Sequence, residues 1–238
     1  MKTVTFNSGA EIPQLGLGTW QLTGTECVNG VEQALELGYQ HIDTAAGYEN
    51  HYEVGQGIKQ ANVAREEIFI TSKVWRTDLR YDDLVASGKQ MLKELGIDYL
   101  DLLLIHWPNS DIPLEETLNG LEELKQQGLT RNVGVSNFTK NHLKDVFAIK
   151  PDLITVNQFE VHPYFYQTEL INYCQENNLA VTAYSPLARG RVFQDQVLAK
   201  LAKKYDRSPA QLVLRWLMEQ GIVVIPKSSS AWHMEDNL

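Results

Sequence analysis

Short apolar runs alternate with longer amphipathic segments along most of the chain, and this alternation constrains the fold more than any other feature. Eight of the runs have the length and residue types of buried strands. They lie near 14–18, 40–43, 67–72, 99–105, 132–135, 153–157, 179–184 and 222–226. Eight strands, each followed by a helix, predict an α/β fold of the closed parallel (β/α)8 type, a TIM barrel. A doubly wound open sheet is the competing interpretation of the same pattern.

The segments between the runs carry helical periodicity. Between 114 and 124, leucines recur at three- and four-residue spacing, which places them on one face of a helix. Further along, Ser208 and Pro209 precede the apolar segment AQLVLRWLMEQ, and Gly221 follows it. This order is typical of a helix with a capping serine, a proline in the first turn and a glycine just past its end.

The two ends of the chain carry distinct expectations. No stretch rich in Pro, Gly or Ser divides residues 1–238, so we expect a single barrel domain. The opening segment VTFNSGAEIP predicts a β-hairpin that turns at 7–9 and covers the barrel floor. Only AWHMEDNL follows the residues after the last strand, so we expect a truncated eighth helix of roughly two turns.

Composition argues against several classes of function. A formal net charge of −9 disfavours nucleic acid and anionic membrane surfaces as partners, because both attract basic proteins. No apolar run approaches the roughly 20 residues that span a bilayer, and the N-terminus lacks the apolar core of a secretory signal. Cys27 and Cys174 suggest neither a disulfide framework nor a metal site, and the six histidines show no zinc spacing. We therefore expect a cytoplasmic protein without a metal.

A polar side chain follows nearly every apolar run. In a parallel barrel the C-terminal strand ends face a common mouth, where the active site lies. Those ends carry Asp43, Lys73, His106, Ser136, Asn137, Gln158, Tyr184, Lys227 and Ser228, with Tyr48 in the loop after the second strand. A satisfied hydrogen bond at a strand end would explain any one of these residues. The whole set predicts a site at the mouth.

The residue types at the mouth predict acid catalysis. Lys73 and Asp43 would be costly to bury apart and tolerable as a pair. We expect the lysine cation to lower the Tyr48 pKa from its free value of about 10, which makes the phenol a usable general acid. His106 is suited to hold a substrate carbonyl toward that phenol. A proton on the carbonyl oxygen requires a hydride on its carbon, which a nicotinamide cofactor supplies and no side chain does.

The remaining strand ends suit such a cofactor. Ser136, Asn137 and Gln158 offer the donors and acceptors that a carboxamide needs. Tyr184 is suited to stack on the nicotinamide ring, with core packing as the alternative, and Lys227 is suited to meet a phosphate.

Three tryptophans, Trp20, Trp75 and Trp107, also lie at strand ends. They predict an apolar, ring-stacking substrate pocket, with ordinary rim packing as the alternative.

These segments together resemble the aldo-keto reductase family. The matching stretches are GLGTW at 16–20, HIDTAAGYEN at 41–50, ITSKVW at 70–75, LLLIHWP at 102–108, VGVSNF at 133–138, VNQFEVHPY at 156–164, AYSPLARG at 183–190, SPAQLVLRW at 208–216 and VIPKSS at 224–229. The short loops and the motif sequences resemble those of the bacterial branch that includes 2,5-diketo-gluconate and methylglyoxal reductases. The resemblance implies an enzyme that transfers hydride between NADPH (NADP) and a small-molecule aldehyde or ketone, without metal.

The resemblance also assigns roles to residues. It makes Asp43, Tyr48, Lys73 and His106 the catalytic tetrad. The cofactor contacts that it implies are Ser136, Asn137 and Gln158 at the carboxamide, Tyr184 on the nicotinamide, Ser185 and Leu187 along the pyrophosphate, Lys227 and Ser228 at the 2′-phosphate side, and Asp236 and Asn237 at the adenine.

Two departures from the family pattern carry expectations. The arginine that usually packs on the adenine and helps to bind the 2′-phosphate is replaced by His233, so we expect a weakened NADPH preference and some use of NADH. The short last helix predicts a more open pocket, weaker substrate discrimination and an exposed apolar strip on the side of the barrel. Two explanations of the strip stay open: a second copy covers it, or the sequence is a trimmed form of a longer chain. The expected state is a monomer or a weak homo-oligomer.

Two other functions are compatible with the sequence. The first is a cofactor-binding regulatory or sensor barrel with little turnover. The second is a Schiff-base aldolase that uses Lys73, which would need a neutral lysine and is therefore opposed by the neighbouring Asp43.

Overall fold

The computed structural model describes residues 2–238, and its main element is an eight-stranded parallel sheet with the strand order β10-β9-β8-β7-β6-β5-β4-β3. The strands are β3 (Leu17–Gly18), β4 (His41–Asp43), β5 (Phe69–Val74), β6 (Leu100–Ile105), β7 (Thr130–Ser136), β8 (Ile154–Glu160), β9 (Ala180–Tyr184) and β10 (Val223–Ile225). Each strand falls on or beside one of the eight apolar runs, because these are the segments that a sheet covered by helices buries on both faces.

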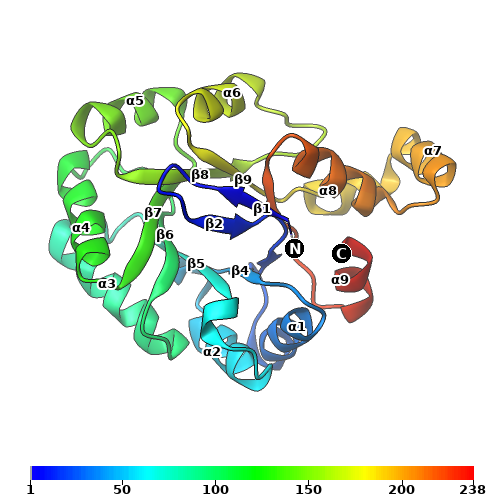
Figure 1. Cartoon of the computed structure of the whole chain (residues 1–238), viewed down its shortest axis with the longest axis horizontal. Helices are drawn as coiled ribbons and strands as arrows, with labels where there is room; N and C mark the ends of the chain where they lie inside the picture. Colours follow the sequence, from blue (N-terminus) through cyan, green and yellow to red (C-terminus); the bar gives the residue numbers. More distant parts are fainter. Residues whose placement is uncertain (1) are drawn as a thin grey trace.

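Two isolated bridges join the first and last strands of this order and close the sheet into a barrel, whose helices form the outer ring in Figure 1. Leu15 forms a parallel bridge with Val224, and Gly18 forms one with Lys227. A Cβ atom on Gly18 would lie 2.8 Å from the carbonyl oxygen of Ile225, so only a glycine allows this close approach. The predicted barrel is confirmed, and the open doubly wound sheet is wrong.

Helices surround the barrel. They are α1 (Gly24–Glu36), α2 (His51–Gln60), α3 (Tyr81–Leu95), α4 (Leu114–Gln126), α5 (Lys140–Ile149), α6 (Thr168–Glu176), α7 (Gln196–Tyr205), α8 (Pro209–Glu219) and α9 (Ala231–Asn237), with short 3-10 turns η1 (Ala46–Tyr48), η2 (Arg65–Glu67) and η3 (Ala188–Gln194). The predicted leucine face of α4 is confirmed, because Leu118, Leu121 and Leu124 are buried. In α9, seven residues form the expected two turns. Of the helices between residues 2 and 238, none combines the length and hydrophobicity that a membrane crossing requires.

The capping signals act as the sequence predicts. The Ser208 hydroxyl accepts a hydrogen bond from the backbone N–H of Gln211, and the Gln211 side chain accepts one from the Ser208 backbone, each at 3.1 Å. This reciprocal capping box starts α8 at Pro209. The pattern of one helix per strand missed α7, which lies between β9 and α8 and stands out from the ring in Figure 1. Asp195 starts this extra helix by accepting from two of its backbone N–H groups.

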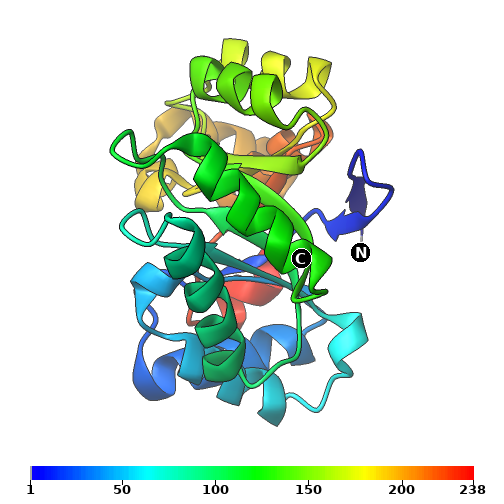
Figure 2. The ribbon, with the colours of Figure 1, turned by 90° about the vertical axis from the view of Figure 1, so that its left-hand side faces the viewer.

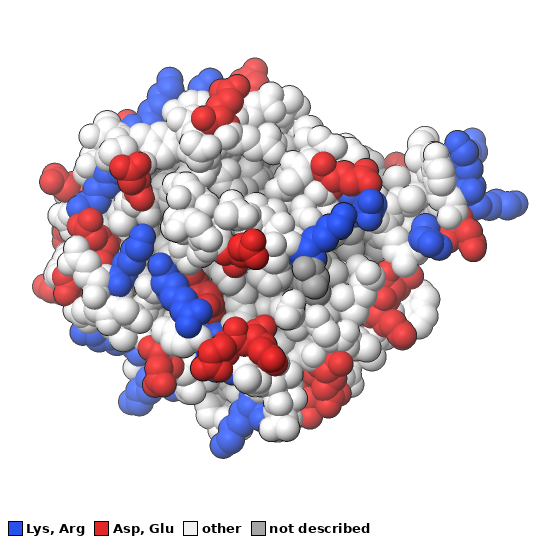
Figure 3. Space-filling model, viewed as in Figure 1, with Lys and Arg blue, Asp and Glu red and all other residues white. Residues whose placement is uncertain are grey.

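The N-terminal hairpin closes the floor of the barrel. Its strands β1 (Thr3–Thr5) and β2 (Glu11–Pro13) pair antiparallel, and Figure 2 shows them at one end of the molecule. Phe6 packs into the inward-facing cluster of the barrel, and the Ser8 hydroxyl donates to Asn132 Oδ1 at 2.8 Å. The predicted hairpin and its position are confirmed. On the face shown in Figure 3, basic and acidic side chains are interspersed.

Two helical glycines give a matched test of the packing around the barrel. A Cβ atom on Gly55 of α2 would lie 2.3 Å from the carbonyl oxygen of Leu95, whereas one on Gly30 of α1 would meet its nearest neighbours at 3.8 Å. We predict that Gly55→Ala lowers the free energy of unfolding by about 1–3 kcal/mol through overpacking. Gly30→Ala should raise it by up to about 1 kcal/mol through helix propensity. Urea denaturation measures both, and equal effects would contradict the packing described here.

Candidate active site

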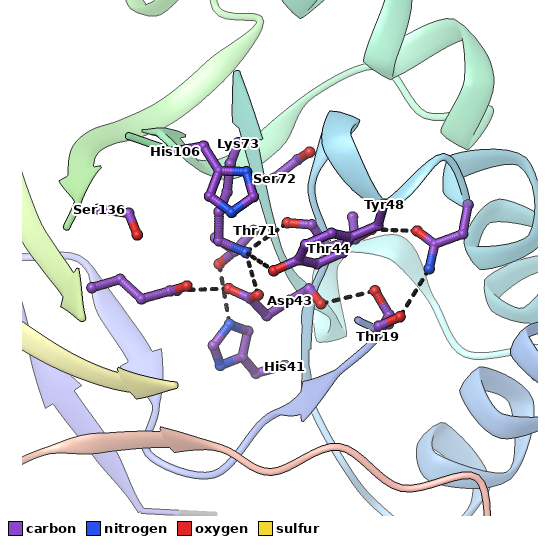
Figure 4. Close-up of polar contacts among 12 residues, drawn as sticks. Thr19, His41, Asp43, Thr44, Tyr48, Thr71, Ser72, Lys73, His106 and Ser136 are labelled. Carbon is purple, nitrogen blue, oxygen red and sulfur yellow. Dashed lines mark hydrogen bonds and ion pairs between the residues drawn. The ribbon is translucent and has the colours of Figure 1, made fainter. Parts of the chain in front are cut away.

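A buried lysine at the mouth of the barrel organises the site. Lys73, near the end of β5, is completely buried, and Asp43 at the end of β4 is 1% exposed. The Lys73 Nζ atom donates to Asp43 Oδ1 at 2.5 Å and to the Thr44 carbonyl oxygen at 2.9 Å, and it lies 3.4 Å from Tyr48 Oη (Figure 4). All three ammonium protons therefore have a partner, which offsets much of the cost of burying the charge. The predicted convergence of Asp43, Lys73 and Tyr48 is present.

Tyr48 reaches the lysine because the chain turns tightly after β4. The turn η1 ends at Tyr48, and Glu49 then adopts a left-handed backbone conformation with φ of 56°. Gly47 packs its backbone against the ring of Trp75, where a Cβ atom would lie 2.8 Å from the nearest ring atom. The tryptophan after β5 thus holds the turn that carries the phenol.

His106 lies beside the phenol. Its ring meets the Tyr48 ring edge-on, with the centroids 5.6 Å apart, and meets the Trp75 ring in the same way at 5.2 Å. The His106 Nδ1 atom is buried and has no hydrogen-bond partner among residues 2–238. Burial and the Lys73 charge lower the His106 pKa to about 3, so this imidazole is neutral at physiological pH.

Charge and burial oppose each other at Lys73 and Tyr48. Burial lowers the pKa of Lys73, but the Asp43 charge and the hydrogen bonds with Asp43 and Tyr48 together raise the pKa above its ordinary value. Burial raises the pKa of Tyr48, and the Lys73 cation offsets only part of this rise. The predicted net decrease in the Tyr48 pKa is therefore wrong, although the lysine acts in the predicted direction. The site holds a charged lysine and a protonated phenol, and a charged lysine is no Schiff-base nucleophile.

A cavity of about 1010 Å³ opens above the tetrad. The predicted site residues on its wall are Trp20, Asp43, Tyr48, Trp75, His106, Trp107, Asn137, Gln158, Tyr184, Ser185, Leu187, Lys227, Ser228, His233, Asp236 and Asn237. Lys73 and Ser136 are not on the wall and lie buried beneath it. The volume is at the upper limit of the range of about 300–1,000 Å³ that is typical of small-molecule sites.

Hydrogen bonds join the amide side chains of the rim to the tetrad. Gln158 Nε2 donates to Asp43 Oδ2 at 2.8 Å, so the carboxylate is held by Gln158 as well as by Lys73. The Tyr184 hydroxyl donates to Asn137 Oδ1 at 2.8 Å, and Asn137 Nδ2 donates to the His106 carbonyl oxygen at 3.0 Å. Ser136 contributes from below by accepting from Asn137 Nδ2 at 3.1 Å. Each rim amide is therefore hydrogen-bonded to a member of the predicted tetrad, Gln158 to the Asp43 carboxylate and Asn137 to the His106 backbone.

The residues of the cavity fit a nicotinamide dinucleotide. The flat ring of Tyr184 and the amides of Asn137 and Gln158 line the cavity together with the tetrad, and Lys227 supplies a cation that is suited to a phosphate. Asp236, also on the wall, accepts a hydrogen bond from the Ser208 hydroxyl at 2.5 Å. Between residues 2 and 238, no group of three or more His, Cys, Asp or Glu is placed to hold a metal ion.

Several residues of the site escape prediction from the sequence. The guanidinium of Arg189, which lines the cavity, lies 5.3 Å from the ring centroid of Trp20. Thr44 and Asn50 are buried behind Tyr48 and hydrogen-bond to each other at 2.9 Å. A threonine after a strand and an asparagine before a helix are common, so only their three-dimensional contacts distinguish them.

Comparisons with known proteins identify the family. The model of the "Aldo/keto reductase family" matches residues 14–238. A glyoxal reductase of Bacillus subtilis is 43% identical over 99% of this chain and 85% of its own length, and methylglyoxal reductase DkgB of Escherichia coli O157:H7 is 40% identical over 95% and 86%. The crystal structure of a Bombyx mori aldo-keto reductase in complex with NADP superposes with a TM-score of 0.91 at 36% identity, over 99% of this chain and 86% of that one.

The barrel and these matches define an oxidoreductase. The chain belongs to the aldo-keto reductase family, and its bacterial relatives include the glyoxal and methylglyoxal reductases.

The buried ion pair makes a prediction about stability. Replacement of Lys73 by methionine leaves the Asp43 carboxylate buried without its cation, so we expect Lys73→Met to lower the free energy of unfolding by about 3–5 kcal/mol. The double variant Asp43→Asn with Lys73→Met should recover part of this loss, because it removes the uncompensated charge. A double-mutant cycle in urea measures the coupling, and additive effects would show that the two groups do not interact.

The low pKa values of two buried histidines predict that acid destabilises the folded protein. The His106 pKa is about 3, and that of His41, which is lowered by burial, is about 4. An unfolded histidine titrates near pH 6.5, so below that pH the unfolded chain binds protons that the folded chain does not. Stability should therefore decrease as the pH falls from about 6.5 toward 4. Unfolding at pH 7 and pH 5 tests this, and His106→Gln should reduce the difference; an unchanged difference would contradict the assignment.

Proposed function

We propose that this protein reduces a small aldehyde or ketone to the alcohol, with hydride from NADPH and a proton from Tyr48. The observation that carries the proposal is the 3.4 Å approach of the charged Lys73 Nζ to Tyr48 Oη beneath the cavity. The bacterial relatives support a reactive dicarbonyl such as methylglyoxal as the first substrate to test, because they are named for glyoxal and methylglyoxal. The NADP complex of the Bombyx mori enzyme supports the cofactor.

The tetrad divides the acid chemistry among its members. Neutral His106 donates a hydrogen bond to the carbonyl oxygen and holds it at the Tyr48 hydroxyl. Tyr48 gives its proton to that oxygen as negative charge develops on it. Lys73 stabilises the phenolate that remains, and Asp43 keeps the lysine charged and in place. NADPH, when bound, supplies the hydride to the carbonyl carbon.

The rim residues bind the cofactor in this proposal. Asn137 and Gln158 hold the carboxamide with the side-chain acceptors and donors that their bonds within the protein leave free, and Tyr184 lies against the nicotinamide ring. Ser185 and Leu187 line the pyrophosphate, Lys227 and Ser228 meet the 2′-phosphate, and His233, Asp236 and Asn237 contact the adenosine. Trp20, Trp75 and Trp107 surround the substrate; their exposed fractions of 42%, 37% and 42% leave ring surface free for it.

The proton donor gives the direct test of function. The wild-type protein should oxidise NADPH, seen as loss of absorbance at 340 nm, when methylglyoxal or an aromatic aldehyde is added. Tyr48→Phe should lose about 10²-fold or more of kcat and still bind NADPH, because only the proton donor is removed. A Tyr48→Phe variant with near wild-type kcat would refute the assignment. Tight NADPH binding by a wild-type protein with negligible turnover on a carbonyl panel would instead support the sensor alternative.

Cofactor choice gives a second test. Lys227 is the cation at the proposed 2′-phosphate site, and His233 lacks the permanent bidentate charge of an arginine. We predict appreciable turnover with NADH, and we expect His233→Arg to increase the ratio of kcat/KM for NADPH to that for NADH by about tenfold, the effect of one charge-assisted contact. A wild-type ratio that already strongly favours NADPH would contradict the proposed role of His233.

A further inference from the structure

We propose that Asn50 is a positioning residue for the proton donor, acting through Thr44 to hold Lys73 against Tyr48. The inference rests on the proposed function, because Tyr48 must be the acid for its support to affect turnover. Asn50 does not itself line the cavity, and no hydrogen bond joins its side chain to Tyr48, so its effect on the reaction is indirect.

The Asn50 side chain is buried and fully engaged. It is 1% exposed, its Oδ1 accepts from the Thr44 hydroxyl at 2.9 Å, and its Nδ2 donates to the carbonyl oxygens of Thr19 and Leu22, each at 2.9 Å. One amide therefore ties the loop after β4 to the loop after β3, which carries Trp20. Figure 4 shows the contacts of Thr19 and Thr44 around Tyr48.

The position of Asn50 in the chain argues for a specific role. Asn50 is the N-cap residue of α2, where an asparagine side chain ordinarily accepts a hydrogen bond from the first turn of the helix. Here it makes no such bond, and its amide is hydrogen-bonded instead to the loops after β3 and β4. Helix α2 therefore lacks the stabilisation that a side-chain N-cap provides. Departures of this kind from local preference concentrate at functional sites.

Thr44 transmits the constraint to the lysine. Its carbonyl oxygen accepts from Lys73 Nζ at 2.9 Å, its backbone N–H donates to the Thr71 carbonyl oxygen at 2.9 Å, and its hydroxyl is bound by Asn50. The bond to Thr71 holds the Thr44 backbone against β5, and the bond to Asn50 holds the Thr44 side chain against the start of α2. The Thr44 carbonyl and the Asp43 carboxylate together set the direction of the Lys73 ammonium group toward Tyr48.

The other end of the same loop is also tied to the lysine strand. His51, which follows Asn50, is 3% exposed, and its Nε2 atom lies 2.8 Å from Ser72 Oγ, one residue before Lys73. The segment that carries Tyr48 is therefore held at Thr44 and again at Asn50 and His51. Loss of the Asn50 amide would leave the buried Thr44 hydroxyl and two carbonyl groups without these partners, and the loop would be free to shift.

The experiment separates positioning from simple stabilisation. Asn50→Ala removes the amide, Thr44→Val removes its partner hydroxyl at nearly constant volume, and Thr44→Ser restores that hydroxyl. Asn132→Ala is the matched control, because Asn132 is a buried asparagine at the barrel floor whose side chain is likewise hydrogen-bonded on both its oxygen, by Ser8, and its nitrogen, to Asp101. For each protein we would measure kcat and KM for methylglyoxal with NADPH, the solvent deuterium isotope effect on kcat, the NADPH Kd by tryptophan fluorescence, and the Tm.

The proposal predicts a loss in kcat. Asn50→Ala should lower kcat on the order of 100-fold, the effect of a small misplacement of a catalytic group, with the NADPH Kd near wild type. Its solvent isotope effect should increase, because transfer of the Tyr48 proton becomes slower relative to other steps. Thr44→Val should change in the same direction and Thr44→Ser should stay near wild type. Asn132→Ala should lower the Tm and leave kcat and the isotope effect unchanged.

Other results would overturn the proposal. Wild-type kcat in Asn50→Ala and Thr44→Val, a loss confined to NADPH affinity, or an equal loss in Asn132→Ala would each refute positioning. If Asn50→Ala does not fold, the two Thr44 variants decide, and equal kcat in both would count against the proposal. Absence of turnover in the wild-type protein would refute the proposed function itself, and the positioning role with it.

Discussion

A lysine side chain with no access to solvent is the constraint on which the rest of the site depends. The Lys73 ammonium can be buried only if each of its protons meets an oxygen, and the three oxygens come from Asp43, Thr44 and Tyr48. Asp43 and Thr44 keep the ammonium group charged and directed at Tyr48, whose phenol the proposed reaction uses. Burial also raises the pKa of Tyr48 and lowers that of His106, so the phenol keeps its proton and the imidazole stays neutral.

The barrel makes this arrangement possible because parallel strands bring sequence-distant residues to one edge. Asp43 on β4 pairs in register with Thr71 on β5, two residues before Lys73, so the pair forms between adjacent strands. Gln158 reaches Asp43 from β8, 115 residues further along the chain. The hairpin fills the opposite end of the barrel, and the mouth is left to the loops that hold Tyr48 and the tryptophans.

Much of the fold and the candidate site could be predicted from the sequence because both follow from repeated local patterns. Buried strands appear in the sequence as apolar runs, and a polar residue such as Asp43 or Lys73 at the end of a run indicates the mouth of the barrel. Two kinds of information were out of reach. The net pKa of Tyr48 depends on the balance of burial against one cation, which spacing does not reveal, and Asn50 has the sequence position of an ordinary helix cap. The additional helix α7 was missed because a barrel pattern predicts one helix per strand.

The central claim is that the Lys73 cation makes the Tyr48 phenol a stronger acid than its burial alone would allow. NMR titration of the protein labelled with ¹³Cζ-tyrosine measures the pKa of that phenol directly, and Tyr48→Phe assigns its resonance. In Lys73→Met the Tyr48 pKa should be higher than in the wild-type protein, because burial still raises this pKa and the lysine charge that lowers it has been removed. An unchanged or lower pKa would contradict the account.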